Sequence, residues 1–156
     1  MEAARLIGLP TTSVALRPAC ENDLEAVTAL LGHLGYQWSS DELHDFYYRL
    51  LEDPALTMIL AVRGGATVVG LMSLRITAVL RLNGNQLSVQ ELVVHQDYRE
   101  QGIGTRLLQF ARQYALKKQV VRLEVLTSRT QDCYKRRFYE KLGFHMATNA
   151  VYRLHF

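Results

Sequence analysis

The chain has 156 residues, of which 49% are hydrophobic and 21% are charged. This size and balance are typical of one compact globular domain and exclude an intrinsically disordered chain. The formal net charge of +3 suits an anionic ligand but is too small to indicate a nucleic-acid partner by itself.

The first third of the chain predicts one strand and two helices. Residues 13–17 alternate in polarity, as a half-buried strand does. Asn22 or Asp23 is placed to cap a helix over residues 24–35, where apolar residues recur at helical spacing. A second helix is expected over residues 39–51, because it opens on a Ser-x-x-Glu capping box.

The middle of the chain predicts a run of strands and then the longest helix. Residues 58–62 and 68–79 flank the dipeptide Gly64-Gly65, which is typical of a hairpin turn. Residues 87–94 form the next expected strand. A helix over residues 103–118 then shows a clear apolar stripe and ends in two lysines, which suit its negative end.

The last part predicts a strand over residues 120–126, a helix over residues 132–142 that ends at Gly143, and one or two strands within residues 144–156. The whole order is a mixed α+β arrangement with one β-α-β crossover. The crossover contains the loop REQGIGTR, residues 99–106.

Two cysteines, Cys20 and Cys133, stand far apart without a CxxC pair or a Cys/His cluster. This spacing argues against a disulfide scaffold and a structural zinc site, so we expect free thiols and no metal. The N-terminal apolar run is too short for a signal peptide, and no stretch reaches the length of a membrane span. We therefore expect a cytoplasmic protein with no membrane partner.

Two glycines, Gly102 and Gly104, stand at the start of the long helix. Without a Cβ there, an anion can approach the exposed N–H groups at the positive end of the helix dipole, and Arg99 and Arg106 add positive charge. A turn that only lets helix and strand pack closely is the alternative. The GK[ST] of a P-loop is absent, and Leu107 occupies the third glycine position of a dinucleotide fingerprint.

The segment ELVVHQDYREQGIGTRLLQFA resembles the acetyl-CoA-binding motif of the GNAT superfamily of N-acetyltransferases, a strand followed by [Q/R]xxGx[G/A] and a helix. About forty residues later, RRFYEKLGF resembles the second signature of that family. The resemblance implies an α+β GNAT fold with a mixed, mostly antiparallel sheet of six or seven strands flanked by four helices. Residues 13–156 would form a single domain behind an extension of residues 1–12.

The resemblance implies acetyl-CoA as co-substrate. The backbone of Leu92, Val93 and Val94 would bind the pantetheine arm, and the N–H of Val93 would face the thioester carbonyl and stabilise the charge that develops there. The alternative is a strand that is merely buried, and both can hold because the chemistry uses only backbone. The pyrophosphate would lie on the loop formed by Arg99, Glu100, Gln101, Gly102, Ile103, Gly104 and Thr105.

For catalysis, the resemblance implies that Tyr139 protonates the departing thiolate of CoA. A packed helix tyrosine is the alternative. Glu91 is the candidate base for the amine, although an exposed edge glutamate needs no function. His33, His44 and His95 have weaker claims as bases, since His95 is placed to cap a turn and His33 to end a helix.

The acceptor would bind between the first two helices and the sheet, where Tyr36 and Trp38 are candidates to contact it. Glu42, Asp45 and Tyr48 are further candidates, and a pocket rich in carboxylates and aromatic rings would suit a cationic amine. An ordinary helix surface and core is the alternative for all five residues.

The sequence departs from the family at two positions. Gln96 stands where many relatives have Pro, which predicts a less rigid loop, and Asp132 stands where many have an Asn that contacts the cofactor. An aspartate cannot donate as an amide does, so we do not carry that contact over. The basic cluster of residues 135–137 is a candidate contact for the 3′-phosphate of CoA, and a solvated helix face is the alternative.

These features favour an N-acetyltransferase in which a primary amine of a small molecule or peptide attacks acetyl-CoA directly in a ternary complex. A non-catalytic acyl-CoA-binding regulatory domain is the main alternative, and a small nucleic-acid-binding domain is a weaker one. We expect no nucleic-acid partner and leave a homodimer open.

Overall fold

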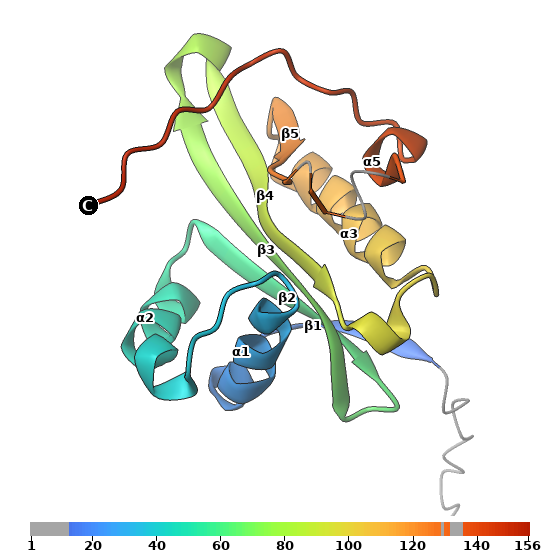
Figure 1. The fold of residues 1–156 in the computed structure, drawn as a ribbon. Coiled ribbons are helices and arrows are strands. Elements are labelled where there is room, and N and C mark those ends of the chain that lie inside the picture. The colour runs from blue at the N-terminus through green and yellow to red at the C-terminus, as the bar shows by residue number, and fades with distance from the viewer. Residues whose placement is uncertain (1–12, 129, 132–135) are drawn as a thin grey trace, which may run out of the picture. The chain divides into compact units, whose positions relative to one another are not determined.

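The computed structural model describes residues 13–128, 130–131 and 136–156 (Figure 1). They form two compact units, one that ends at Leu126 and one that runs from Thr127 to Phe156. Cys20 is an exposed free thiol. The expected extension of residues 1–12, and Cys133, lie outside the described residues.

The first unit is built on one mixed sheet. Its strands are β1 (Val14–Pro18), β2 (Leu56–Arg63), β3 (Thr67–Val79), β4 (Gly84–Val94) and β5 (Arg122–Val125). They lie in the order β1-β2-β3-β4-β5, with antiparallel pairs from β1 to β4 and a parallel pair between β4 and β5. The mostly antiparallel sheet is confirmed, but the described residues contain five strands and not six or seven.

Three helices cover the two faces of this sheet: α1 (Leu24–Gly32), α2 (Ser40–Glu52) and α3 (Ile103–Lys117). In Figure 1, α1 and α2 lie on one face of the sheet and α3 lies on the other. The strand β2 is therefore buried on both sides: Leu60 packs in the core beneath α1 and α2, whereas the adjacent residue, Ala61, faces α3. This explains why β2 reads as a continuous apolar run and not as an alternating one.

The second unit contains the short helix α5 (Phe138–Lys141), followed by Gly143 in the left-handed region at φ +84°. Part of the expected helix, residues 132–135, lies outside the described residues. The expected final strands are wrong, since no residue from Phe144 to Phe156 is in a strand. Alternating apolar residues favour a strand, but they do not supply the neighbouring backbone that its hydrogen bonds require.

Helix α2 begins as its sequence predicts. The Ser39 hydroxyl accepts a hydrogen bond from the Glu42 N–H (3.2 Å), and the Glu42 carboxylate accepts one from the Ser39 N–H (2.7 Å). The capping box is confirmed, and it leaves the Glu42 side chain occupied at the helix start.

Asp23 stands at the N-cap position of α1, but its side chain bonds elsewhere. The carboxylate is buried and accepts two hydrogen bonds of 2.7 Å from the Arg17 guanidinium and one of 2.8 Å from the Cys20 N–H. These bonds outweigh the cost of burial and lower the pKa of Asp23 to about 2. The ion pair thus ties β1 to the start of α1.

Asp23→Asn is expected to lower the free energy of unfolding at pH 7 by about 2 kcal/mol. A carboxylate with a lowered pKa contributes stability above its ordinary pKa of 3.8, and this is lost as the pH falls toward 2. Urea unfolding between pH 7 and pH 2 measures the effect. The exposed Asp45→Asn is the control, and equal acid sensitivity in wild type and Asp23→Asn would contradict the assignment.

Candidate active site

The N-terminus of α3 is open to an anion. Gly102 is its N-cap residue, no side chain caps it, and its first turn holds no acidic residue. The start of α2, by contrast, is closed by its capping box. Because the first N–H groups of a helix have no partner within the helix, the start of α3 presents bare donors at the positive end of a 15-residue helix.

The space in front of Gly102 is also open. Its φ of +78° favours glycine, and a Cβ built there would meet no other atom within 4 Å. The next residue, Ile103, is buried, and its side chain lies 3.4 Å from the position of a Cβ on Gly70 in β3. The close approach at Gly70 therefore seats the helix on the sheet, while Gly102 leaves the backbone bare toward solvent. These residues fit a diphosphate.

Of the predicted residues, Arg99 to Gly102 lie in the turn between β4 and α3, and Ile103 to Thr105 begin α3 itself. Arg99 Nε donates to the Val94 carbonyl oxygen at 3.1 Å, and Gln101 Nε2 donates to the Asp97 carbonyl oxygen at 3.4 Å. Arg99 therefore ties the loop to the end of β4. The guanidinium of Arg106 donates instead to the Val14 carbonyl in β1.

The pairing of β4 with β5 ends halfway along β4, because β5 ends at Val125. The two strands pair only from Gln86 to Val89, and within the described residues the part of β4 after Val89 pairs with β3 alone. The register between β3 and β4 also shifts at this point, because Ser73 is paired with Glu91 and Leu74 with Val89, so that Gln90 is the extra residue of a bulge. The second half of β4 thus has an open backbone edge.

The bulge decides which main-chain groups face that edge. Before it, the carbonyl of Val89 accepts from Leu126 on the β5 side. After it, the N–H of His95 donates to Val69 in β3, whereas the carbonyl of Val94 points to Arg99. Since directions alternate along a strand, Leu92 and Val94 face the open edge and Val93 faces β3. The N–H group of Val93, which we expected to face the thioester, therefore points to β3, and the N–H groups at the open edge are those of Leu92 and Val94.

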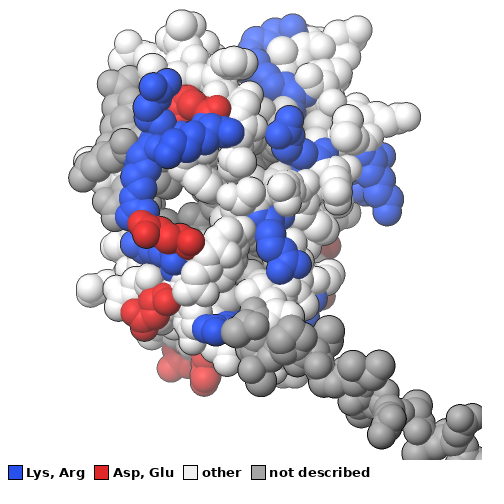
Figure 2. All heavy atoms as spheres, turned by 90° about the vertical axis from the view of Figure 1, so that its right-hand side faces the viewer, with Lys and Arg blue, Asp and Glu red and all other residues white. Residues whose placement is uncertain are grey.

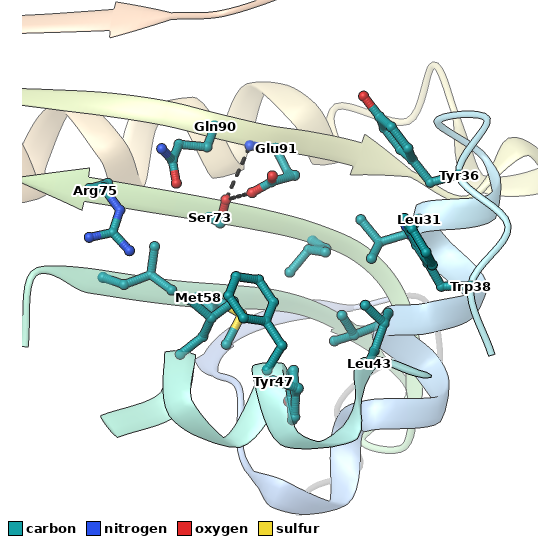
Figure 3. Close-up of a pocket in the computed structure, with 15 residues that line it drawn as sticks. Leu31, Tyr36, Trp38, Leu43, Tyr47, Met58, Ser73, Arg75, Gln90 and Glu91 are labelled. Atoms are coloured by element: carbon teal, nitrogen blue, oxygen red, sulfur yellow. Dashed lines mark hydrogen bonds between the residues drawn. The ribbon is translucent and has the colours of Figure 1, made fainter. Parts of the chain in front are cut away.

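A pocket of about 570 Å³ lies on the side of the sheet covered by α1 and α2. Figure 3 shows residues that line it. The pocket brings together three residues that the sequence suggested separately, namely Glu91, Tyr36 and Trp38. Of the other acceptor candidates, Glu42, Asp45 and Tyr48 are not among its lining residues.

Glu91 projects into this pocket next to polar residues that sequence reasoning missed. Its carboxylate accepts a hydrogen bond from the Ser73 hydroxyl, which in turn accepts from the Glu91 N–H at 3.1 Å. Burial raises the pKa of Glu91, and the charge of Arg75 opposes that rise. Arg75 itself forms an ion pair of 2.9 Å with Asp53. A carboxylate with a raised pKa is suited to exchange protons near neutral pH.

The sequence contains a partial indication of the polar residues beside Glu91, but it can be recognised only once the pairing of β3 with β4 is known. These residues are Ser73, Arg75 and Gln90. Ser73 and Arg75 alternate along β3 after the buried Leu71, so they extend the face that carries the core. Their meeting with Gln90 and Glu91 depends on the pairing of β3 with β4, which no local pattern gives.

The histidine alternatives have structural roles. His95 Nδ1 accepts from the Asp97 N–H at 3.3 Å and caps the 3-10 turn before the loop, and His33 is the C-cap residue of α1. Both expectations are confirmed. The two rings lie 4.5 Å apart, and burial lowers the pKa of His33. His44 pairs with the exposed Asp45 at 3.0 Å.

Tyr139 lies in α5 of the second unit. Its ring is half-buried, with the rings of Phe138 at 5.2 Å and Phe144 at 6.2 Å between centroids. Its carbonyl accepts from the N–H groups of Leu142 and Phe144, which closes the Gly-Phe turn. The catalytic role of Tyr139 stays a prediction. Asp132 and Lys135 lie outside the described residues.

Among the described residues, no helix has the length and apolar character needed to cross a membrane. In the same part of the chain, no three His, Cys, Asp or Glu side chains gather as they do around a metal ion.

The family model of the acetyltransferase (GNAT) family matches residues 23–144. An acetyltransferase from Trypanosoma brucei is 26% identical, with a TM-score of 0.75 over 92% of this chain and 100% of that one. A transcriptional regulator from Bacillus halodurans C-125 is 25% identical, with a TM-score of 0.80 over 92% of this chain and 100% of that one.

Glucosamine-6-phosphate N-acetyltransferase from Arabidopsis thaliana has a TM-score of 0.77 over 91% of this chain and 98% of that one, but at 17% identity it shows the fold alone. No curated protein matched the sequence. The family match spans most of the chain and includes the open edge of β4, the bare start of α3 and the pocket beside Glu91. The chain therefore belongs to the GNAT family of acetyltransferases, and this membership points to acyl transfer as its activity.

Proposed function

We propose that the chain is an acetyl-CoA-dependent N-acetyltransferase in which a primary amine attacks the thioester directly in a ternary complex. The observation that carries the proposal is the continuity between the open edge of β4 and the uncapped start of α3, joined by Arg99. A long ligand with an amide-bearing arm and a diphosphate matches both features. The family normally uses acetyl-CoA, which supplies an activated acetyl group.

Each part of this surface has a separate task. The N–H groups of Ile103, Gly104 and Thr105 bind the diphosphate, and each such bond to a charged acceptor contributes about 1.5–3 kcal/mol. The main-chain groups of Leu92 and Val94 bind the pantetheine arm as an added strand would. One of these two N–H groups donates to the thioester oxygen as negative charge develops on it.

Glu91 acts as the general base on the acceptor amine. Its carboxylate lies in the pocket, and burial raises its pKa, which brings it closer to the working pH. The Ser73 hydroxyl fixes the orientation of the carboxylate. Tyr139 acts as the general acid and gives its phenolic proton to the departing sulfur. No metal takes part, and we place the activity in the cytoplasm.

A regulatory, non-catalytic acyl-CoA-binding domain is the second candidate, because the similar protein from Bacillus halodurans C-125 is a transcriptional regulator. Such a domain would keep the diphosphate site and lack turnover. Nucleic-acid binding has less support. On the face drawn in Figure 2, Lys and Arg side chains lie in several separate groups with Asp and Glu among them, and not in one continuous stripe.

Tyr139→Phe is expected to lower kcat about 100-fold, at the low end of general-acid effects because a thiolate leaves readily as an anion. The affinity for acetyl-CoA should stay within twofold of wild type. Thiol release in the presence of an amine measures the rate, and calorimetry measures the affinity.

Tyr152→Phe is the matched control for this variant, because Tyr152 lies in the same unit and is 94% exposed. If Tyr139→Phe turns over like wild type, the assignment of the acid is wrong. If wild type binds acetyl-CoA and acetylates no amine, the regulatory candidate replaces the enzyme.

A further inference from the structure

The pocket beside Glu91 is unusually apolar for a site that accepts a cationic amine. Eleven of its fifteen lining residues are aliphatic or aromatic, and the four polar ones are Ser73, Arg75, Gln90 and Glu91. Figure 3 shows that these four come from β3 and β4, at one end of the pocket. The opposite end is formed by the α1–α2 side of the molecule. The pocket thus has one polar end and one apolar end.

The pocket also carries aromatic rings that the protein covers only in part. Tyr36 is 56% exposed, Trp38 52% and Phe46 52%, and all three line the pocket. Large apolar side chains that are exposed together around one cavity mark a surface completed by an apolar ligand. A polar or multiply charged acceptor would leave these rings in contact with water.

The charged side chains that line the pocket can neutralise one ammonium group. Glu91 is the single carboxylate among the lining residues. Glu42, an acidic candidate on α2 that is not among the lining residues, is held by Ser39 in the capping box. Arg75 is paired with Asp53 at 2.9 Å, and its positive charge disfavours a second cation at the polar end. A diamine or polyamine would therefore bring a second ammonium group for which the lining residues offer no second carboxylate.

We propose that the acceptor is a primary monoamine carried on an aromatic or bulky aliphatic body, such as an arylalkylamine. The inference rests on the proposed function and adds its substrate class. The amine lies beside Glu91 at the polar end, and its carbon body packs on Tyr36, Trp38 and Phe46. This replaces the carboxylate-rich pocket for cationic acceptors that the sequence suggested.

Thiol release from acetyl-CoA is measured with four acceptors: 2-phenylethylamine, L-phenylalanine, putrescine and spermidine. 2-Phenylethylamine should have a kcat/KM at least about 30-fold above both polyamines, because only the latter bring an unpaired charge. It should also exceed L-phenylalanine, whose carboxylate would lie next to that of Glu91. A preference for either polyamine, or for L-phenylalanine, overturns the proposal.

Trp38→Ala should raise the KM for 2-phenylethylamine about tenfold and leave kcat within twofold, as expected for a contact made equally in ground and transition states. Leu80→Ala, which removes a side chain that is 98% exposed and outside the pocket, should change neither constant. An unchanged KM in Trp38→Ala contradicts the placement of the carbon body.

Trp38→Glu should narrow the preference for 2-phenylethylamine over putrescine by about tenfold, since it adds the second carboxylate that a diamine requires. Calorimetry with acetyl-CoA distinguishes a failure of the proposed function from a failure of the proposed acceptor class. A chain that binds no acetyl-CoA refutes the proposed function, whereas a chain that binds it and prefers polyamines refutes the monoamine class alone.

Discussion

Gly102→Ala is expected to weaken acetyl-CoA binding about 100-fold, which corresponds to the loss of one or two N–H bonds to the diphosphate. The added methyl group would meet no protein atom, so its main steric effect falls on whatever occupies the open space before α3. The φ of +78° adds strain that any L residue would share, at about 1–2 kcal/mol. Calorimetric titration with acetyl-CoA measures the affinity.

Gly65→Ala is a matched control for that strain. Gly65 lies in the turn between β2 and β3 at φ +80°, and a Cβ there also meets nothing within 4 Å. The two variants should therefore lose similar stability in urea unfolding, and only Gly102→Ala should lose affinity. If both variants bind acetyl-CoA like wild type, the start of α3 is a packing turn and not a diphosphate site.

Glu91→Gln is expected to lower kcat about 1,000-fold if the carboxylate takes the proton of the amine. The amide oxygen of Gln can still accept a hydrogen bond from Ser73, so the change removes basicity and keeps the shape. In wild type, kcat/KM should rise with pH through the raised pKa of Glu91 and then level off. In Glu91→Gln this rise of kcat/KM with pH, the acid limb of the profile, should be absent.

Stability separates this catalytic effect from a folding defect. Because burial raises the pKa of Glu91, its ionisation in the folded state costs free energy, and its contribution to stability falls as the pH rises through that pKa. Glu91→Gln should therefore be at least as stable as wild type at pH 7, and the difference should shrink at low pH. Glu25→Gln, an exposed position on α1, is the control.

A Glu91→Gln enzyme that keeps its rate and its acid limb would show that another group accepts the proton. His33 and His95, whose ring centroids lie 4.5 Å apart, would then be tested next.

Local patterns predicted the local features of the fold. The capping box at Ser39, the glycine hairpin after β2 and the turn cap at His95 each depend on residues within four positions of one another, and each is confirmed. The start of α3 follows the same rule, because Gly102 stands where its left-handed backbone is needed.

Features that depend on pairing between distant strands were not accessible from the sequence. The bulge at Gln90 shifts the alternation of β4 by one residue, and this moves the outward-facing groups from Val93 to Leu92 and Val94. The same register sets Ser73 against Glu91, two residues separated by seventeen others. A bulge has no strong signature in a strand such as LSVQELVV, so an unbroken alternation was the simplest reading.

The lining of the pocket beside Glu91 differs from the carboxylate-rich set that the resemblance suggests. The family resemblance makes Glu42 and Asp45 candidates for the acceptor site, but α2 contributes Leu43, Phe46 and Tyr47 to the lining of the pocket and neither carboxylate. Periodicity identifies the apolar face of a helix, and here that face lines both the core and the cavity.

The proposed function depends above all on the main-chain amides at the start of α3, which we propose bind the diphosphate of acetyl-CoA. The most direct test is an amide nitrogen–proton NMR titration of the labelled protein with acetyl-CoA. The largest saturable shifts are expected at Ile103, Gly104 and Thr105, with further shifts at Leu92 and Val94. If saturation with acetyl-CoA leaves the amides of Ile103, Gly104 and Thr105 unmoved, the start of α3 does not bind the diphosphate.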